Sequence, residues 1–139
     1  MSKSIKATTL LIAGLTIATT MLPSCHETFE ERCRREAQEH TEKYCPQIID
    51  QYQTLDSMTY RSNPEGFNYY YSMSELMDDA SVYEETAIIE VKQNMVENLK
   101  TNISLRPYME HNFTFTYYYR SATDGTLYTT IALTPEDYH

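Results

Sequence analysis

Two stretches in which apolar and polar residues alternate strictly limit the folds open to this chain more than any other feature. In the first stretch, Phe67, Tyr69, Tyr71 and Met73 alternate with Asn68, Tyr70 and Ser72. In the second, residues 112–120, the alternating apolar members are Phe113, Phe115, Tyr117 and Tyr119. A period of two places such sets on opposite faces of a β-strand. Both stretches therefore predict strands with one face turned toward a core.

A turn joins each of these strands to a second strand. Residues 54–61 resemble a strand, and Asn63-Pro64-Glu65-Gly66 follows as a turn in which proline fixes φ and glycine gives freedom at the exit. Downstream, Thr123-Asp124-Gly125 is an Asp-Gly turn that leads into a strand over residues 126–134. The chain is therefore expected to form two hairpins.

A helix is predicted before each hairpin. Thr28-Phe29-Glu30-Glu31 has the form of a capping box and predicts a helix over residues 28–44, which Pro46 ends. Ser81-Val82-Tyr83-Glu84 has the same form, and the helix that follows must stop before Pro107. The apolar face expected to form the core consists of Val82, Ile89, Val96, Leu99 and Ile103, with Ile88 and Met95 beside it.

The expected fold class is therefore α+β, with the element order α-β-β-α-β-β. We expect a four-stranded antiparallel sheet packed on one main helix, the second. The first helix is charged, with only a thin apolar stripe, and two arrangements remain open for it. It either packs beside the sheet or extends toward a membrane as a stalk.

The first 24 residues have the organisation of an export signal. Lys3 and Lys6 precede an apolar, threonine-rich run over residues 7–21, which is short and polar for a transmembrane helix. Leu22-Pro23-Ser24-Cys25 resembles the lipobox of bacterial lipoproteins. The resemblance implies cleavage after residue 24, acylation of Cys25 and anchorage in the lipid bilayer. An ordinary signal peptide and an N-terminal membrane helix are the alternatives.

Residues 25–139 would then form a single domain of the bacterial cell envelope. His26 follows the anchor, and the absence of aspartate there favours the outer membrane. All 20 acidic residues lie in this part, against 9 of the 11 basic ones, so its formal charge is about −11. Such a domain repels nucleic acid and suits either solubility or a basic envelope protein as partner.

The stretch from Leu55 to Tyr138 is similar to a family of small exported bacterial domains of unknown function. The matching motifs are Leu55-Asp56-Ser57, Tyr69-Tyr70-Tyr71, Leu99-Lys100-Thr101-Asn102, Tyr117-Tyr118-Tyr119, Asp124-Gly125 and Thr134-Pro135-Glu136-Asp137. Members often carry a cysteine after the helix and another at the C-terminal end. Ser104 and Tyr138 occupy those regions here, so that disulfide is missing. The resemblance implies no catalytic residues and no cofactor.

Lipidation of Cys25 would leave Cys33 and Cys45 as a pair. A continuous helix over residues 28–44 would hold them about 18 Å apart, too far for a disulfide. Either the helix is broken, or the thiols are unpaired, or they bond between molecules; we expect one of the last two.

Catalytic and metal-binding patterns are weak. The four histidines are scattered, and Glu36 and His40 with Cys33 make a helical face that is more typical of solvent exposure than of a metal site. Adjacent Asp78 and Asp79 are interpreted as stabilising a helix N-terminus. The sequence therefore predicts no metal and no enzyme.

Tyr70, Tyr118 and Tyr128 are expected on the sheet face opposite the core, among threonine and asparagine. Exposed aromatic residues in such surroundings resemble a protein- or glycan-binding surface, and cross-strand pairing that only stabilises the sheet is the alternative, which we favour. The function predicted is a lipid-anchored, non-catalytic binding module for another protein. A structural accessory of an envelope complex is the alternative, and a hydrolytic enzyme is a remote one.

Overall fold

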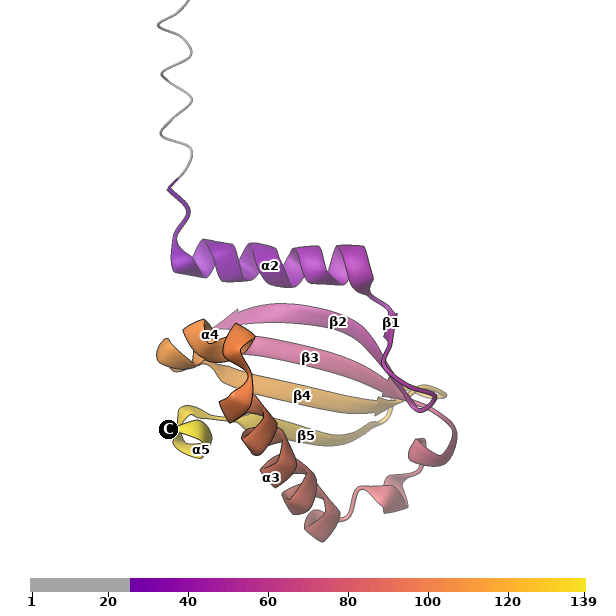
Figure 1. The fold of residues 1–139 in the computed structure, drawn as a ribbon. Helices are drawn as coiled ribbons and strands as arrows, with labels where there is room; N and C mark the ends of the chain where they lie inside the picture. The colour runs from indigo at the N-terminus through magenta and orange to yellow at the C-terminus, as the bar shows by residue number, and fades with distance from the viewer. Residues whose placement is uncertain (1–25) are drawn as a thin grey trace, which may run out of the picture. The chain divides into compact units, whose positions relative to one another are not determined.

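The computed structural model describes residues 26–139 (Figure 1). The predicted export signal, residues 1–24, and the predicted lipidation site Cys25 lie outside the described residues. The chain divides after Arg32 into two parts, and each is described by itself.

The first part contains the beginning of helix α2 (Phe29–Tyr44). The Glu31 backbone N–H donates to Thr28 Oγ1 at 3.1 Å, and the Thr28 N–H donates to Glu31 Oε2 at 2.9 Å. This is the reciprocal pair of hydrogen bonds that defines a capping box. The predicted start of this helix is confirmed.

The second part, residues 33–139, is built on a five-stranded sheet of order β1-β2-β3-β4-β5. The strands are β1 (Gln47–Ile48), β2 (Gln53–Ser62), β3 (Glu65–Met73), β4 (Thr114–Ser121) and β5 (Leu127–Leu133). The α+β class is confirmed, as are both predicted hairpins, which pair antiparallel. The prediction of four antiparallel strands is wrong, because β1 adds a strand and β3 runs parallel to β4.

The connection between the hairpins explains the parallel pair. Helix α3 (Glu85–Thr101) and the short helix α4 (Arg106–Glu110) return the chain from the C-terminal end of β3 to the end of the sheet at which β3 begins. Strand β4 therefore starts beside Gly66, with Tyr69 opposite Tyr117 and Tyr71 opposite Tyr119. A crossover of this kind is the usual connection between parallel strands. Alternation of residues within a strand does not reveal the direction of its neighbour.

The packed helices lie against one face of the sheet, which we call the core face. Phe67, Phe113 and Phe115 are fully buried there. Tyr108 of α4 stacks edge-on against Phe67 at 5.1 Å between ring centroids. Tyr138 of the C-terminal helix α5 (Pro135–Tyr138) donates to the Phe113 carbonyl at 2.7 Å. The aromatic members of the two alternating stretches thus form the core, as predicted.

Residues 33–44 of α2 pack along the outer side of β2 (Figure 1). Cys33 and Ala37 are buried. Thr41 Oγ1 accepts from the Met58 N–H and donates to the Met58 carbonyl, both at 2.8 Å. One side chain therefore satisfies both backbone groups of β2 at a point that β1 does not reach. Of the two predicted arrangements, packing beside the sheet is the one observed for this segment.

The face that α3 turns toward the sheet differs from the prediction. Ile88, Val91 and Met95 point toward the core face, and Leu99 is buried. Ile89 is 51% exposed and Ile103 is 74% exposed, although both were expected in the core. Leu99 is buried as predicted, and Ile88 and Met95 were expected beside the predicted face, whereas Ile89 lies about 100° around the helix from Ile88. Both sides of the helix are apolar, so the pattern alone did not identify the one that packs.

The predicted capping box at Ser81 is also wrong. Residues Ala80–Val82 form a 3₁₀ turn whose N-cap is Asp79, and α3 begins only at Glu85. The predicted end before Pro107 is confirmed, since α3 stops at Thr101 and Pro107 lies in the first turn of α4. Within residues 26–139, none of the helices has the length and apolar character needed to cross a bilayer.

Candidate binding groove between helix α3 and the sheet

An open groove of about 440 Å³ separates α3 from the core face of the sheet. Its floor comes from β3, β4 and β5, and its walls come from α3 and the segment before it. The lining is mostly apolar and aromatic, and includes Tyr71, Met77, Tyr83, Val91, Met95, Tyr117 and Tyr119. A groove of this volume and lining has the character of a binding site for an apolar ligand or an apolar face of a protein.

The floor is a ladder of stacked tyrosines. Parallel pairing places Tyr69 against Tyr117 and Tyr71 against Tyr119, with ring centroids 4.8 and 5.3 Å apart. Burial raises the pKa of Tyr71 above its usual value, and the pKa of Tyr117 and Tyr119 is raised further by the same cause. These phenols are therefore neutral over the physiological range, and the floor contributes flat apolar surface rather than charge.

The wall is adaptable. Met77 and Met95 face the groove from opposite ends of the wall. Methionine has an unbranched, flexible side chain that adjusts to the shape of a ligand. Val91 lies between them and is 43% exposed, so it is available for contact. The groove therefore has a rigid aromatic floor and a flexible aliphatic wall.

Asp78 binds the β4–β5 hairpin to the segment before α3, next to the groove. Its carboxylate accepts from Thr123 Oγ1 at 2.6 Å and from the Tyr128 hydroxyl at 2.7 Å. The hydroxyls of Ser121, Thr123 and Tyr128 lower the Asp78 pKa from 3.8 to about 2. Tyr128 also stacks on Tyr83 at 4.9 Å. Asp78 thus holds in place the tyrosine that stacks on Tyr83.

The segment that supplies much of the wall is strongly acidic. Between positions 75 and 90 every charged residue is an acid, namely Glu75, Asp78, Asp79, Glu84, Glu85 and Glu90. An apolar groove beside an acidic segment is complementary to a partner segment that is apolar on one side and basic on the other.

The tyrosines predicted as a binding surface do not lie together. Tyr70 and Tyr118 stack face to face at 4.8 Å on the sheet face opposite the core. Tyr128 stands apart, because the register shift that pairs Tyr119 with Thr129 and Arg120 with Leu127 leaves it unpaired in β5. It stacks on Tyr83, which lines the groove, and donates a hydrogen bond to Asp78. The grouping of all three on one face is therefore wrong.

Sequence reasoning missed the groove and its residues Met77 and Tyr83. Met77 lies in a 3₁₀ turn, Glu75–Met77, and Tyr83 donates to the Met77 carbonyl at 2.7 Å. Neither position belongs to an alternating or helical pattern. The one available signal was the excess of apolar positions on α3, which offers more apolar surface than one packed stripe requires.

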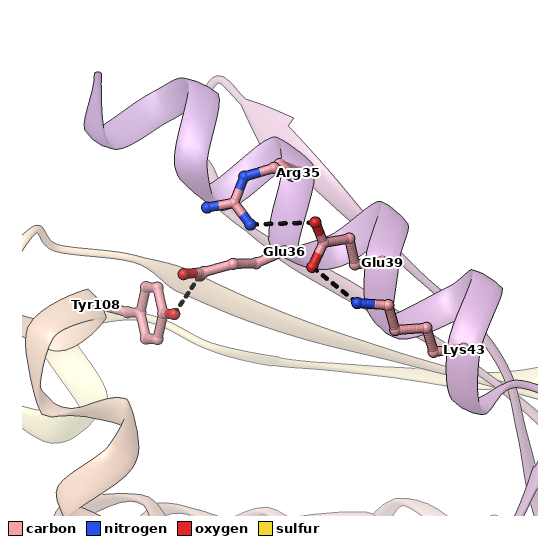
Figure 2. A network of polar contacts seen from close by, with 5 residues as sticks. All are labelled: Arg35, Glu36, Glu39, Lys43 and Tyr108. Carbon is pink, nitrogen blue, oxygen red and sulfur yellow. Dashed lines mark hydrogen bonds and ion pairs between the residues drawn. The ribbon is translucent and has the colours of Figure 1, made fainter. Parts of the chain in front are cut away.

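The charged surface of α2 shows no site chemistry (Figure 2). Glu39 pairs with Arg35 at 3.2 Å and with Lys43 at 3.4 Å, all three being exposed. Glu36 instead accepts from the Tyr108 hydroxyl at 2.5 Å and so joins α2 to α4. No group of three metal-ligating side chains occurs within residues 26–139. Asp79 caps a 3₁₀ turn by accepting from the Ser81 N–H, whereas Asp78 binds the hairpin, so they are not an acid–base pair.

Continuity of α2 keeps the two cysteines apart. Cys33 is buried within the helix, and Cys45 follows its last residue and carries a free thiol. Burial and the nearby Asp56 raise the Cys45 pKa, which disfavours the reactive thiolate.

Two solved structures share this fold. One is a Pseudomonas aeruginosa protein that is predicted to be secreted, with a TM-score of 0.62, 9% identity, and coverage of 82% of this chain and 100% of the other. The second is a pilotin, EpsS, from the type 2 secretion system of Vibrio vulnificus, with a TM-score of 0.58, 14% identity, and coverage of 79% and 91%. Neither is described as an enzyme. At these identities the likeness concerns the fold.

Residues 28–129 match a domain of unknown function, DUF8479, and the chain belongs to this family. Curated protein sequences include none with significant similarity to this chain. The family match agrees with the predicted resemblance to a domain of unknown function.

Proposed function

We propose that this protein is a lipid-anchored domain of the bacterial cell envelope that binds another envelope protein without catalysing a reaction. The bound element is an amphipathic, basic segment, and the site is the groove between α3 and the sheet. The groove carries this proposal, because it is open and apolar and because the segment that supplies part of its wall is acidic. Amphipathic helices commonly dock in such grooves by burying one apolar face.

The lining argues for binding rather than catalysis. Its polar members among the described residues are tyrosines, Gln53 and Thr129, and the tyrosine phenols are held neutral by burial. A hydrolytic site needs a nucleophile beside a base, or a metal, within reach of the substrate. The groove brings together no such pair.

The envelope location rests on the lipobox resemblance of Leu22-Pro23-Ser24-Cys25. It is supported by the fold shared with a protein predicted to be secreted and with a type 2 secretion pilotin. A structural accessory role in an envelope complex is the second candidate, and the pilotin fold favours it. The two candidates differ in whether a separable segment of the partner binds this domain alone.

Site-specific photo-crosslinking in the intact producing bacterium tests the proposal. A photo-reactive phenylalanine replaces Val91 in the full chain, and Ile103, which is 74% exposed and outside the groove, serves as the control position. We expect crosslinks at position 91 to an envelope protein, at a segment with an apolar face and an excess of Lys and Arg. Equal crosslinking from both positions, or capture of an acidic segment, would contradict the proposal.

A synthetic peptide of the captured segment then tests whether the groove binds it alone. We expect Val91→Glu to weaken peptide binding at least tenfold, and Ile103→Glu to leave it unchanged. Binding should also weaken as salt is raised, because the charges of the acidic segment are exposed. A Tyr70→Ala/Tyr118→Ala double variant tests the predicted surface on the opposite face. If only that variant loses binding, the sheet face and not the groove is the site.

A further inference from the structure

The two edges of the sheet differ in whether their outer backbone groups have hydrogen-bond partners. On one side, β1 pairs with part of β2, and Thr41 satisfies both backbone groups of Met58 beyond it. On the other side, β5 is the last strand, and no described residue forms a hydrogen bond with its outer backbone groups. One edge is closed and the other is open.

Apart from the irregularity at Tyr128, strand β5 lacks the features that usually prevent pairing with another chain. Its sequence, Leu127-Tyr-Thr-Thr-Ile-Ala-Leu133, contains no charge and no proline. Natural edge strands are commonly protected by an inward-pointing charge, a proline or a covering element. The chain has a formal net charge of −9, so an uncharged edge strand limits the repulsion that a second acidic chain would meet there.

Helix α3 presents an apolar stripe on the same side of the molecule. The helix packs against β5 and α5, crossing in front of β5 in Figure 1. The residues toward the groove are Ile88, Val91 and Met95, while Ile89 and Val96 lie on the other flank, in a hollow that includes Asp137 of α5. We call Ile89 and Val96 the outer stripe. Because α3 packs on β5, the last strand, and its groove flank lies over β3 and β4, the opposite flank is directed toward the open edge.

We propose that a second copy of this chain occupies the open edge, with its β5 paired antiparallel to the first β5 and centred on Thr130. The two sheets then form one continuous sheet. The outer stripes of the two α3 helices face each other across the two-fold axis on the core side. In this register Leu127 of one copy lies opposite Leu133 of the other, and Thr130 lies opposite its own counterpart.

Charge and symmetry favour a second copy over another partner. The charged residues in the hollow around the outer stripe are Lys92, Glu97 and Asp137. Lys92 pairs with Asp137 at 3.3 Å, and Glu97 lies 4.0 Å from Lys100, so these charges are balanced within each copy. A two-fold contact uses the same patch twice, so each outer stripe covers the other and each open edge is paired. The groove residues lie on the other flank of α3, and this inference does not depend on the proposed groove function.

Disulfide trapping tests the contact in the full, membrane-targeted chain. Thr130→Cys is combined with Cys45→Ser in one chain. A separate chain with Ile48→Cys, a 79% exposed position beside the closed edge, is the matched control. Residues directly opposite in an antiparallel pair have Cα atoms about 4.5–5.5 Å apart, which suits a disulfide. We expect oxidation to convert most of the Thr130→Cys chain into a species of twice its mass and to leave the control monomeric.

Further substitutions separate this contact from chance collision and from the groove. Adding Ile89→Glu should reduce the crosslinked fraction at least fivefold, because it places like charges at the axis, whereas adding Val91→Glu should leave it unchanged. The proposal is overturned if Thr130→Cys crosslinks no more than Ile48→Cys. It is also overturned if the captured species has the mass of a different protein, or if Ile89→Glu has no effect.

Discussion

Asp78 is the residue through which pH should act on this fold. Hydrogen bonds from three hydroxyls lower its pKa from 3.8 to about 2. Above pH 3.8 the carboxylate is charged in both the folded and the unfolded chain, and its hydrogen bonds stabilise the fold in full. As pH falls from 3.8 toward about 2, the unfolded chain binds the proton first, so this stabilisation is lost over that interval.

We therefore expect the melting temperature of the native protein to fall more steeply from pH 3.8 to about 2 than that of Asp78→Asn. The measurement is thermal unfolding followed by circular dichroism at a series of pH values. Glu136→Gln, at an exposed position, corrects for the loss of one negative charge. Parallel pH profiles for native protein and Asp78→Asn would show that this carboxylate does not contribute.

Gly66 is required by the close approach of β3 to β4. A Cβ atom at this position would lie 1.9 Å from the Thr114 carbonyl oxygen, which belongs to the opposing backbone. Gly66→Ala should therefore separate the strands and lower the free energy of unfolding by about 1–3 kcal/mol. Urea titration measures this, with the exposed Ser62→Ala as control. A change within about 0.5 kcal/mol, which is typical of surface substitutions, would contradict it.

At the scale of the elements, α2 acts as a cover for the edge of β2. Thr41→Val keeps the side-chain shape but removes the oxygen that bonds both backbone groups of Met58. Loss of these two bonds should cost about 1–3 kcal/mol of unfolding free energy. Chemical denaturation gives the value, with Thr86→Val on the exposed face of α3 as the matched change. Equal stability of the two variants would mean that water replaces the Thr41 hydroxyl at no cost.

The helices and strands also show which parts of the fold sequence patterns can predict. Alternation predicted the long strands, because a strand with one buried face requires it. The direction of β4 relative to β3 was not predictable, since it depends on the path of the connecting helices. Thr134-Pro135-Glu136-Asp137 was interpreted as the end of a strand, but Thr134 and Asp137 form the capping box of α5. Strand β1 has only two residues, too few for any period.

The candidate site was predictable only in part for a related reason. The core-face tyrosines Tyr71, Tyr117 and Tyr119 were correctly grouped by alternation. Whether a helix lies flat on them or leaves a groove depends on its tilt, which is set by Tyr83, Asp78 and the hairpin beyond. The contact between Asp78 and Tyr128 joins residues 50 positions apart, and no local pattern encodes it.

At the scale of the whole molecule, the predicted lipid anchor depends on one residue, Cys25. Cys25→Ala should abolish labelling by radioactive palmitate and move the protein from the membrane fraction to the soluble fraction, because a stable anchor needs the acyl chains. Cys45→Ala is the control and should keep both the label and the membrane location. Retention of the Cys25→Ala chain in membranes would point instead to an uncleaved N-terminal helix.

The closure of one sheet edge by Thr41 has a consequence for assembly size. A sheet with two open edges recruits strands at both, and such growth has no natural end. Here a pairing at β5 consumes the open edge, so the composite sheet ends on either side at the short strand β1 and at the part of β2 that Thr41 covers. Association of this kind would be self-terminating, and a concentrated, membrane-confined population would remain as discrete pairs rather than extend into filaments.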